Sequence, residues 1–177
     1  MFLGVEMAAF ELGVCSGSER FVSDQDLEKA LAKVLETFDG VENLSAEQRD
    51  GIASLIRRHD VLAVLPTGYG KSLLFQLIPK LCVELHNLGY SCYPKSLIVI
   101  QVICPLNALI ECHMKQLERR GISCTCLSGD DADQDGAFAG RYSFTFTNPE
   151  ALILNEKWRK MLRMPVSQKN LFGIVAD

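Results

Sequence analysis

A glycine-rich turn followed by lysine and serine is the feature of this chain best suited to chemistry. Residues 65–72 read Leu-Pro-Thr-Gly-Tyr-Gly-Lys-Ser, after a short apolar run and before a stretch with helical spacing. A strand, a glycine turn and a helix that begins at Lys-Ser wrap backbone N–H groups around a polyphosphate. The strict pattern G-x-x-x-x-G-K-S/T lacks its first glycine, which here is Leu65. We interpret the turn as a phosphate-binding loop rather than an ordinary strand-to-helix turn.

Individual loop residues suit particular parts of a nucleotide. Gly68 and Gly70 allow backbone angles and a close approach that a Cβ would block. Lys71 can place an ammonium against the β- and γ-phosphates, and the Ser72 hydroxyl can ligate Mg²⁺. The ATP-binding candidates within the loop are Thr67, Gly68, Tyr69, Gly70, Lys71 and Ser72.

The composition of the chain limits what it can be. A length of 177 residues with 48% hydrophobic side chains suits one domain, or a large piece of one. The net charge of −4 gives no general reason to expect nucleic acid, so such binding needs a local surface. The seven cysteines lack C-x-x-C spacing and are interpreted as reduced, mostly buried thiols. Without a secretory signal or a membrane-length apolar run, the sequence predicts a soluble intracellular protein.

Strands and helices are expected to alternate around the loop. Strands are predicted over 61–65, 97–104, 122–127, 142–147 and 171–176. Helices are predicted from a Ser23 cap to near Gly40, from a Ser45 cap to Arg58, from Lys71 until Pro79 bends or breaks it before 81–85, and over 109–121. The alternation favours a three-layer α/β domain with a mainly parallel sheet. Residues 1–22 are expected to form a flexible tail, and 23–177 the domain.

Four further motifs accompany the loop in a fixed order. Gln48 precedes the loop in Leu-Ser-Ala-Glu-Gln-Arg, and the later motifs are Cys-Pro-Leu-Asn-Ala-Leu (104–109), Thr-Asn-Pro-Glu-Ala-Leu (147–152) and Ile-Val-Ala-Asp (174–177). The ordered set resembles the first RecA-like domain of superfamily 2 helicases over about residues 27–177. It is most similar to RecQ DNA helicases, because DEAD-box RNA helicases usually have Pro-Thr-Arg-Glu-Leu-Ala at 105–110.

The resemblance implies an ATP-dependent enzyme that moves 3′ to 5′ on DNA, with ATP and Mg²⁺ as cofactors. It implies that Gln48 binds the adenine edge, that Lys71 and Asp177 are catalytic, and that Ser72 and Asp177 hold Mg²⁺. Backbone contacts to single-stranded and branched DNA would come from Pro105, Leu106, Asn107, Thr147, Asn148 and Pro149. No membrane partner is expected, and a nuclear location is what the resemblance suggests.

Three departures from the usual RecQ pattern affect the adenine site, the helix before Pro79, where Ile78 looks like a one-residue insertion, and residues 129–136, which replace the helix usually found between the two DNA-facing motifs. RecQ proteins usually have Phe-Arg where this chain has Leu44 and Ser45, so the arginine that stacks on adenine is absent and Arg49 is a candidate replacement. Residues 131–136 match the start of an EF-hand calcium loop. The twelfth position is Tyr142 instead of glutamate, so we favour a solvated acidic turn.

The three histidines show no ligand spacing and are interpreted as surface or interhelix residues.

The last motif that resembles RecQ helicases is the acid motif, Ile-Val-Ala-Asp (174–177). The chain stops at Asp177, before the glutamate and the second RecA-like domain that the resemblance predicts downstream. In this fold a strand after the acid motif lies between the phosphate-loop strand and the acid strand. We therefore expect a fragment with exposed strand edges, marginal stability and no DNA-stimulated ATP hydrolysis when made alone. The alternatives left open are an RNA helicase or duplex translocase of the same superfamily, and a non-hydrolysing nucleotide-dependent interaction module.

Overall fold

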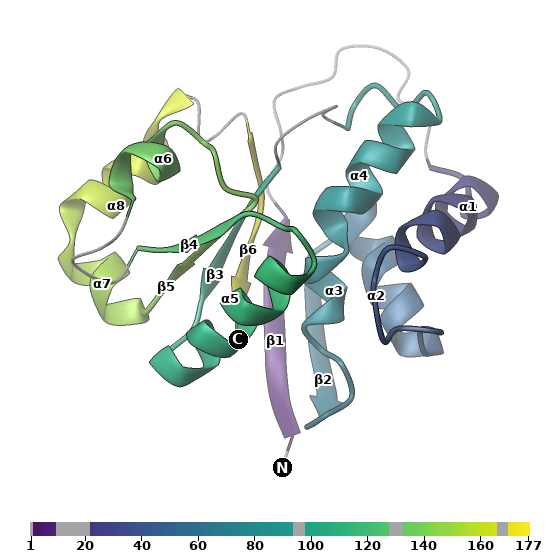
Figure 1. Ribbon diagram of the computed structural model, residues 1–177, viewed down its shortest axis with the longest axis horizontal. Coiled ribbons are helices and arrows are strands. Elements are labelled where there is room, and N and C mark those ends of the chain that lie inside the picture. The colour runs from purple at the N-terminus through teal and green to yellow at the C-terminus, as the bar shows by residue number, and fades with distance from the viewer. Residues whose placement is uncertain (1, 10–21, 94–97, 128–132, 166–169) are drawn as a thin grey trace.

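The computed structural model describes residues 2–9, 22–93, 98–127, 133–165 and 170–177 (Figure 1). Strands and helices alternate through most of these residues. In chain order they are β1 (Phe2–Ala9), α1 (Asp24–Leu35), α2 (Ala46–Ile56), β2 (Val61–Pro66), α3 (Leu73–Gln76), α4 (Ile78–Asn87), β3 (Val99–Ile103), α5 (Asn107–Arg119), β4 (Cys124–Cys126), α6 (Gln134–Phe138), β5 (Phe144–Thr147), α7 (Pro149–Leu154), α8 (Glu156–Arg163) and β6 (Leu171–Ala176).

All strands but one run in the same direction. The sheet has the order β2-β1-β6-β3-β5-β4, and β6, β3, β5 and β4 pair in parallel. Both β2 and β6 are antiparallel to β1, so β2 points the same way as the parallel group. The prediction of an α/β domain with a mainly parallel sheet is therefore confirmed, and the sheet is consistent with a RecA-like fold.

The N-terminal strand corrects two expectations. Phe2–Ala9 forms β1 and is not a flexible tail, while residues 1 and 10–21 lie outside the described part of the chain. Figure 1 shows β1 between β2 and β6, and it pairs with both. The edges of β2 and β6 that face each other are thus both paired with β1 and are not exposed. The segment is mostly apolar, as a strand in the interior of a sheet requires.

Helices cover both faces of the sheet. Ile100 and Phe144 belong to the larger core, which helices α1 to α5 form against β3, β5 and β6. Gln101 and Thr145, the next residues along their strands, point the opposite way and line a small pocket together with Met161 of α8. Trp158 of α8 is buried in a second core cluster on this side. The helices on the two sides of the sheet are visible at right and left in Figure 1, and the arrangement has the predicted three layers.

Local sequence signals explain where the first helices begin. The Ser23 hydroxyl accepts a hydrogen bond from the Asp26 backbone N–H at the start of α1, and Ser45 forms a reciprocal capping box with Gln48 at the start of α2. Both caps were predicted. Pro79 lies in the first turn of α4, so the break falls at Leu77 between α3 and α4. Among the helices in the described ranges, none is long and apolar enough to cross a membrane.

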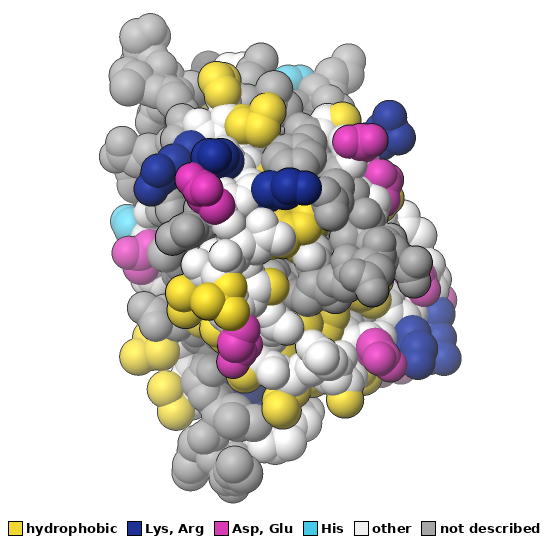
Figure 2. Space-filling view, turned by 90° about the vertical axis from the view of Figure 1, so that its left-hand side faces the viewer, with side chains coloured by type: hydrophobic (Ala, Val, Ile, Leu, Met, Phe, Trp, Pro, Cys, Tyr) yellow, Lys and Arg dark blue, Asp and Glu magenta, His cyan; other side chains and the backbone are white. Residues whose placement is uncertain are grey.

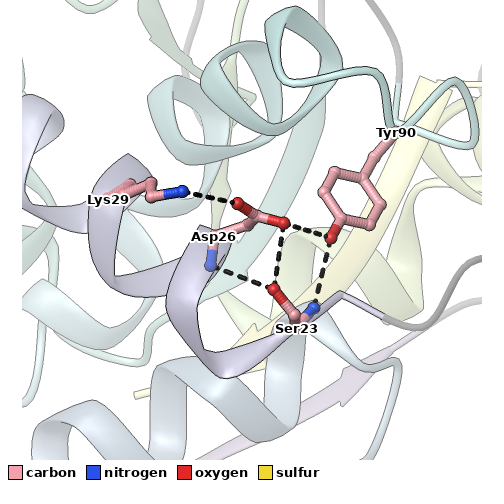
Figure 3. A network of polar contacts seen from close by, with 4 residues as sticks. All are labelled: Ser23, Asp26, Lys29 and Tyr90. Atoms are coloured by element: carbon pink, nitrogen blue, oxygen red, sulfur yellow. Dashed lines mark hydrogen bonds and ion pairs between the residues drawn. The ribbon is translucent and has the colours of Figure 1, made fainter.

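A polar network ties the start of α1 to the segment after α4 (Figure 3). The Tyr90 hydroxyl accepts a hydrogen bond from the Ser23 backbone N–H at 3.2 Å and donates one to Asp26 Oδ2 at 2.8 Å. Lys29 Nζ lies 3.3 Å from Asp26 Oδ1. The hydrogen bond from Tyr90, helped by those from Ser23 and Lys29, lowers the pKa of Asp26 below its usual 3.8. The network joins parts of the chain 67 residues apart.

We expect Tyr90→Phe to lower the melting temperature by a few degrees at neutral pH, because it removes both bonds of the hydroxyl. A depressed pKa means that the stabilisation by the Asp26 carboxylate is present above pH 3.8 and is lost as the pH falls through the folded value. The difference between wild type and variant should therefore shrink in acid. Calorimetric melts from pH 7 down to pH 3 measure this, and a pH-independent difference would contradict the assigned network.

Candidate functional site

The predicted site residues lie at one edge of the sheet. Because β2, β3, β5 and β6 point the same way, their carboxyl ends meet there, at the bottom of Figure 1. The loop follows β2, and Asp177 follows β6. The Asp177 backbone N–H donates to Ile103 O at 3.0 Å, and the Cys104 N–H donates to Thr147 O at 2.9 Å. Ladder bonds thus hold the ends of three motifs side by side, which is the usual place for a ligand in such sheets.

The loop between β2 and α3 has the backbone geometry of an anion site. Gly68 and Gly70 have φ values of +84° and +74°, where a Cβ is strained. Within the described residues, the backbone N–H groups of Gly68, Gly70, Lys71 and Ser72 donate to no protein acceptor. Four neighbouring donors without protein partners at a strand-to-helix turn suit a polyphosphate.

Gly70 is the tightest position in the loop. A Cβ added there would lie 2.7 Å from Gln48 Nε2, whereas one at Gly40, which also has positive φ, meets nothing within 4 Å. We expect Gly70→Ala to weaken ATP binding by roughly 10-fold or more, because strain of about 1–2 kcal/mol combines with a displaced Gln48. Gly40→Ala is the matched control for strain alone. Titration of both variants with ATP tests this, and equal affinities would show that the loop tolerates a side chain at Gly70.

Lys71 and Ser72 end the loop. Lys71 Nζ donates to Leu65 O at 3.1 Å and to Pro66 O at 3.2 Å, so the ammonium lies over the end of β2. An ammonium has three N–H donors, which leaves one for a phosphate. Ser72 is half-buried, and its side chain makes no capping hydrogen bond to α3. The phosphate and metal roles of these two residues stay predictions.

Gln48 is buried against the loop. Its Nε2 donates to Tyr69 O at 2.8 Å, and its Oε1 accepts from the Ser45 backbone N–H at 2.8 Å. The amide therefore connects the cap of α2 to the phosphate-binding loop, a contact that the sequence did not predict. The second lone pair of Oε1 is available to an adenine amino group, whereas Nε2 also lies 3.4 Å from Gly70 O. Arg49, the candidate replacement for the missing arginine, forms an ion pair with Glu28 of α1.

Asp177 is the carboxylate of the site. Its side chain is only 13% exposed, and Oδ2 lies 2.9 Å from His113 Nε2. In the part of the chain that the structure describes, Oδ1 makes no hydrogen bond. Mg²⁺ at nucleotide sites needs only one or two carboxylates beside waters and phosphates, so the donor types of Ser72 and Asp177, a hydroxyl and a carboxylate, suit this ion. Burial raises the pKa of the nearby Cys104 thiol, which therefore stays neutral beside the acid.

His113 is the residue that the sequence interpretation missed. It was taken as a surface or interhelix residue, yet it is 5% exposed and bonded to Asp177 across 64 residues of chain. Its position on the buried face of α5, three residues after Ile110 and four before Leu117, is the one signal of burial in the sequence. The partner could not be inferred without the sheet order.

The six residues predicted to face DNA lie at the same edge but differ in exposure. Pro105, Leu106 and Asn107 are exposed where β3 passes into α5. Thr147 is fully buried, and its hydroxyl donates to Asn148 O. Asn148 caps α7, accepting from the Ala151 backbone N–H at 2.7 Å, and Pro149 is the first residue of that helix. The first three can reach a polymer directly, whereas Thr147 and Asn148 shape the neighbouring turn.

The acidic segment before β5 is described only from Asp133 onward. Asp131 lies outside the described residues. The Asp133 carboxylate accepts from the Gly136 backbone N–H and from the Tyr142 hydroxyl, which fold the segment into the start of α6. Among the residues that are described, no group of three His, Cys, Asp or Glu side chains could hold a metal ion. From Asp133 onward the segment is thus a short capped helix and not the turn that was predicted, while residues 129–132 lie outside the described part of the chain.

The face on the α7–α8 side carries charges of both signs. Figure 2 views the molecule from that side and shows basic and acidic side chains interspersed, with apolar ones between them. Lys160 of α8 pairs with Glu156, and the exposed apolar residues of α7 include Leu154, which is 80% exposed. No single-sign surface for a polyanion is visible in this view.

The sequence can be compared with known proteins. The chain matches the family described as DEAD/DEAH box helicase over residues 45–175. It is 33% identical to the ATP-dependent DNA helicase RecQ of Synechocystis sp., over 86% of this chain and 29% of that protein. It is 32% identical to the probable ATP-dependent DNA helicase RecS of Bacillus subtilis (77% and 26%). Identity to the ATP-dependent DNA helicase Q1 of Rattus norvegicus is 30% (73% and 20%). The chain spans less than a third of the length of each of these relatives.

Proposed function

Because the chain belongs to the DEAD/DEAH box helicases and is of RecQ type, we propose that it is the ATP-binding lobe of a DNA helicase that moves 3′ to 5′ on single strands and unwinds duplexes. The observation that carries the proposal is the shared sheet edge. There the loop donors, the Asp177 carboxylate and the exposed start of α5 follow the carboxyl ends of β2, β6 and β3; β6 and β3 are neighbours, and β1 lies between β2 and β6. In the intact protein, a second RecA-like domain would complete the helicase.

The loop binds the triphosphate in this proposal. The backbone N–H groups of Gly68, Gly70, Lys71 and Ser72, which have no acceptor among the described residues, donate to phosphate oxygens, and the Lys71 ammonium balances the phosphate charge. Gln48 orients the adenine with the amide that now bonds the loop, and Thr67 and Tyr69 line the nucleotide. Magnesium bound through Ser72 and Asp177 would bridge phosphates and neutralise charge that develops during hydrolysis.

Polymer binding uses the neighbouring turns. The backbone of Pro105 and Leu106, together with the Asn107 side chain, contacts sugar and phosphate without reading bases. Thr147, Asn148 and Pro149 support the second turn, as their internal bonds suggest. Because the net charge is −4, binding through backbone donors and short polar side chains is more plausible than binding through a broad basic surface. A nuclear location stays a prediction.

The test uses the full-length protein. ATP hydrolysis is measured with single-stranded DNA, duplex DNA, RNA and no polymer, and unwinding with duplexes that carry a 3′ or a 5′ single-stranded tail. We expect strongest stimulation by single-stranded DNA and unwinding of the 3′-tailed duplex. Stimulation by RNA alone or by duplex alone would instead support one of the alternative motors. ATP binding without hydrolysis under any condition would support a nucleotide-dependent interaction module.

A further inference from the structure

His113 lies deep in the protein beside the acid of the proposed site. It comes from the middle of α5, and its Nε2 is 2.9 Å from Asp177 Oδ2. The side chains are 6% and 13% exposed, so little solvent competes for the contact. The Asp177 backbone is already fixed through its N–H bond to Ile103 O. The histidine adds a second restraint, on the carboxylate itself.

Aromatic packing fixes the imidazole ring. Phe146 of β5 stacks on it with centroids 5.9 Å apart and 12° between the planes, and Phe75 of α3 meets it edge-on at 5.8 Å. Both phenylalanines are fully buried. The two phenylalanines therefore restrain the plane of the ring, and in this plane Nε2 faces Asp177 Oδ2.

The surroundings of the ring also select its tautomer. Nδ1 is buried and, within the described residues, has no hydrogen-bond partner. A hydrogen on Nδ1 would be a buried donor without an acceptor, and it would leave the Nε2 lone pair facing a carboxylate oxygen. A hydrogen on Nε2 avoids both costs. The ring thus donates its Nε2–H to Oδ2.

We infer that His113 is a positioning residue for the Asp177 carboxylate. The inference rests on the proposed function, in which Asp177 holds Mg²⁺ at the phosphates. Donation from Nε2 occupies Oδ2 and turns Oδ1, which has no described hydrogen bond, toward the magnesium shell. Groups behind a metal-binding side chain commonly fix its orientation in this way. His113 itself touches neither nucleotide nor metal in this account.

The contact can be tested in this chain without turnover. Long-range proton–nitrogen NMR spectra of the chain labelled with ¹⁵N-histidine report the tautomer of each of the three rings. We expect the Nε2–H form for His113, and we expect Asp177→Ala to shift its signals while those of His59 stay unchanged. The Nδ1–H form, or signals insensitive to Asp177→Ala, would overturn the inference.

The role is tested by ATPase kinetics of the full-length protein. His113→Phe keeps an aromatic ring in the stack but removes the donor, and His113→Gln retains an N–H that reaches the same place. We expect His113→Phe to lower kcat by about 10- to 100-fold with KM for ATP changed by less than about 3-fold, as for other supporting groups at metal sites. His113→Gln should recover kcat to within about 5-fold of wild type. The exposed His59→Phe is the matched control and should behave as wild type.

The outcomes separate the inference from the proposed function. An active wild type with an unaffected His113→Phe would refute the positioning role and leave the helicase proposal intact. Equal loss in His113→Phe and His113→Gln, at unchanged melting temperature, would also refute it, because the donor would then not matter. A wild type without ATP hydrolysis contradicts the proposed function and this role with it.

Discussion

Lys71→Ala should weaken ATP binding by roughly 10- to 100-fold, the equivalent of charge-assisted hydrogen bonds worth about 1.5–3 kcal/mol. The Lys71 ammonium lies at the end of β2, where it donates to Leu65 O and Pro66 O. It is the cation of the loop itself, and its third N–H donor is available for a phosphate. Alanine removes both the charge and the bonds that hold the loop ends together. Calorimetric titration with ATP in the presence of Mg²⁺ measures the loss.

A second lysine provides the control for this variant. Lys80 lies on α4, where Nζ donates to the Thr37 hydroxyl at 3.1 Å. Lys80→Ala changes net charge by the same amount but removes nothing from the loop, so it should bind ATP as wild type does. Equal weakening in both variants would mean that Lys71 acts only through overall charge. No weakening in Lys71→Ala would contradict the assignment of the loop.

Met7→Pro should destabilise the whole domain. β1 is the link between β2 and the rest of the sheet, and Met7 pairs with Val61 on one side and Val175 on the other. Whichever strand its N–H faces, proline removes a ladder bond in the sheet interior, where proline is rarely found. A cost of about 3 kcal/mol would lower the melting temperature by roughly 6–12 °C in a domain of this size. Scanning calorimetry of this chain measures the shift.

Met7→Val is the control that distinguishes loss of strand pairing from loss of the Met7 side chain. Valine keeps the backbone N–H and favours strands, so it should melt close to wild type. Because β2 leads directly into the phosphate-binding loop, Met7→Pro should also lower ATP affinity well below that of Met7→Val. A proline variant that melts and binds ATP like wild type would show that Phe2–Ala9 does not connect β2 to β6.

The sequence predicted the elements whose signals are local. The strand over 171–176 is found with the same bounds, and the serines that cap α1 and α2 act as expected. These features depend on neighbours within a few residues. The position of β1 depends on partners about 55 and 170 residues away, and its mostly apolar sequence has no clear alternation, so a tail could not be distinguished from an interior strand.

The sequence indicated the motifs of the candidate site but not the hydrogen bonds that connect them. Residue types and spacing indicated the phosphate-binding loop, whereas the role of Asp177 was implied by the resemblance to RecQ helicases. The bonds from Gln48 to the loop and from His113 to Asp177 connect residues 21 and 64 positions apart. They follow from how α2 and α5 pack, which the sequence pattern does not specify.

The central claim is that the turn before Lys71 binds the triphosphate of ATP. Calorimetric titration of this chain with ATP, at several Mg²⁺ concentrations, tests it most directly. The account predicts saturable binding of one ATP per chain that Lys71→Ala weakens and Lys80→Ala does not. Absence of binding at every Mg²⁺ concentration, in a chain that melts cooperatively, would contradict it.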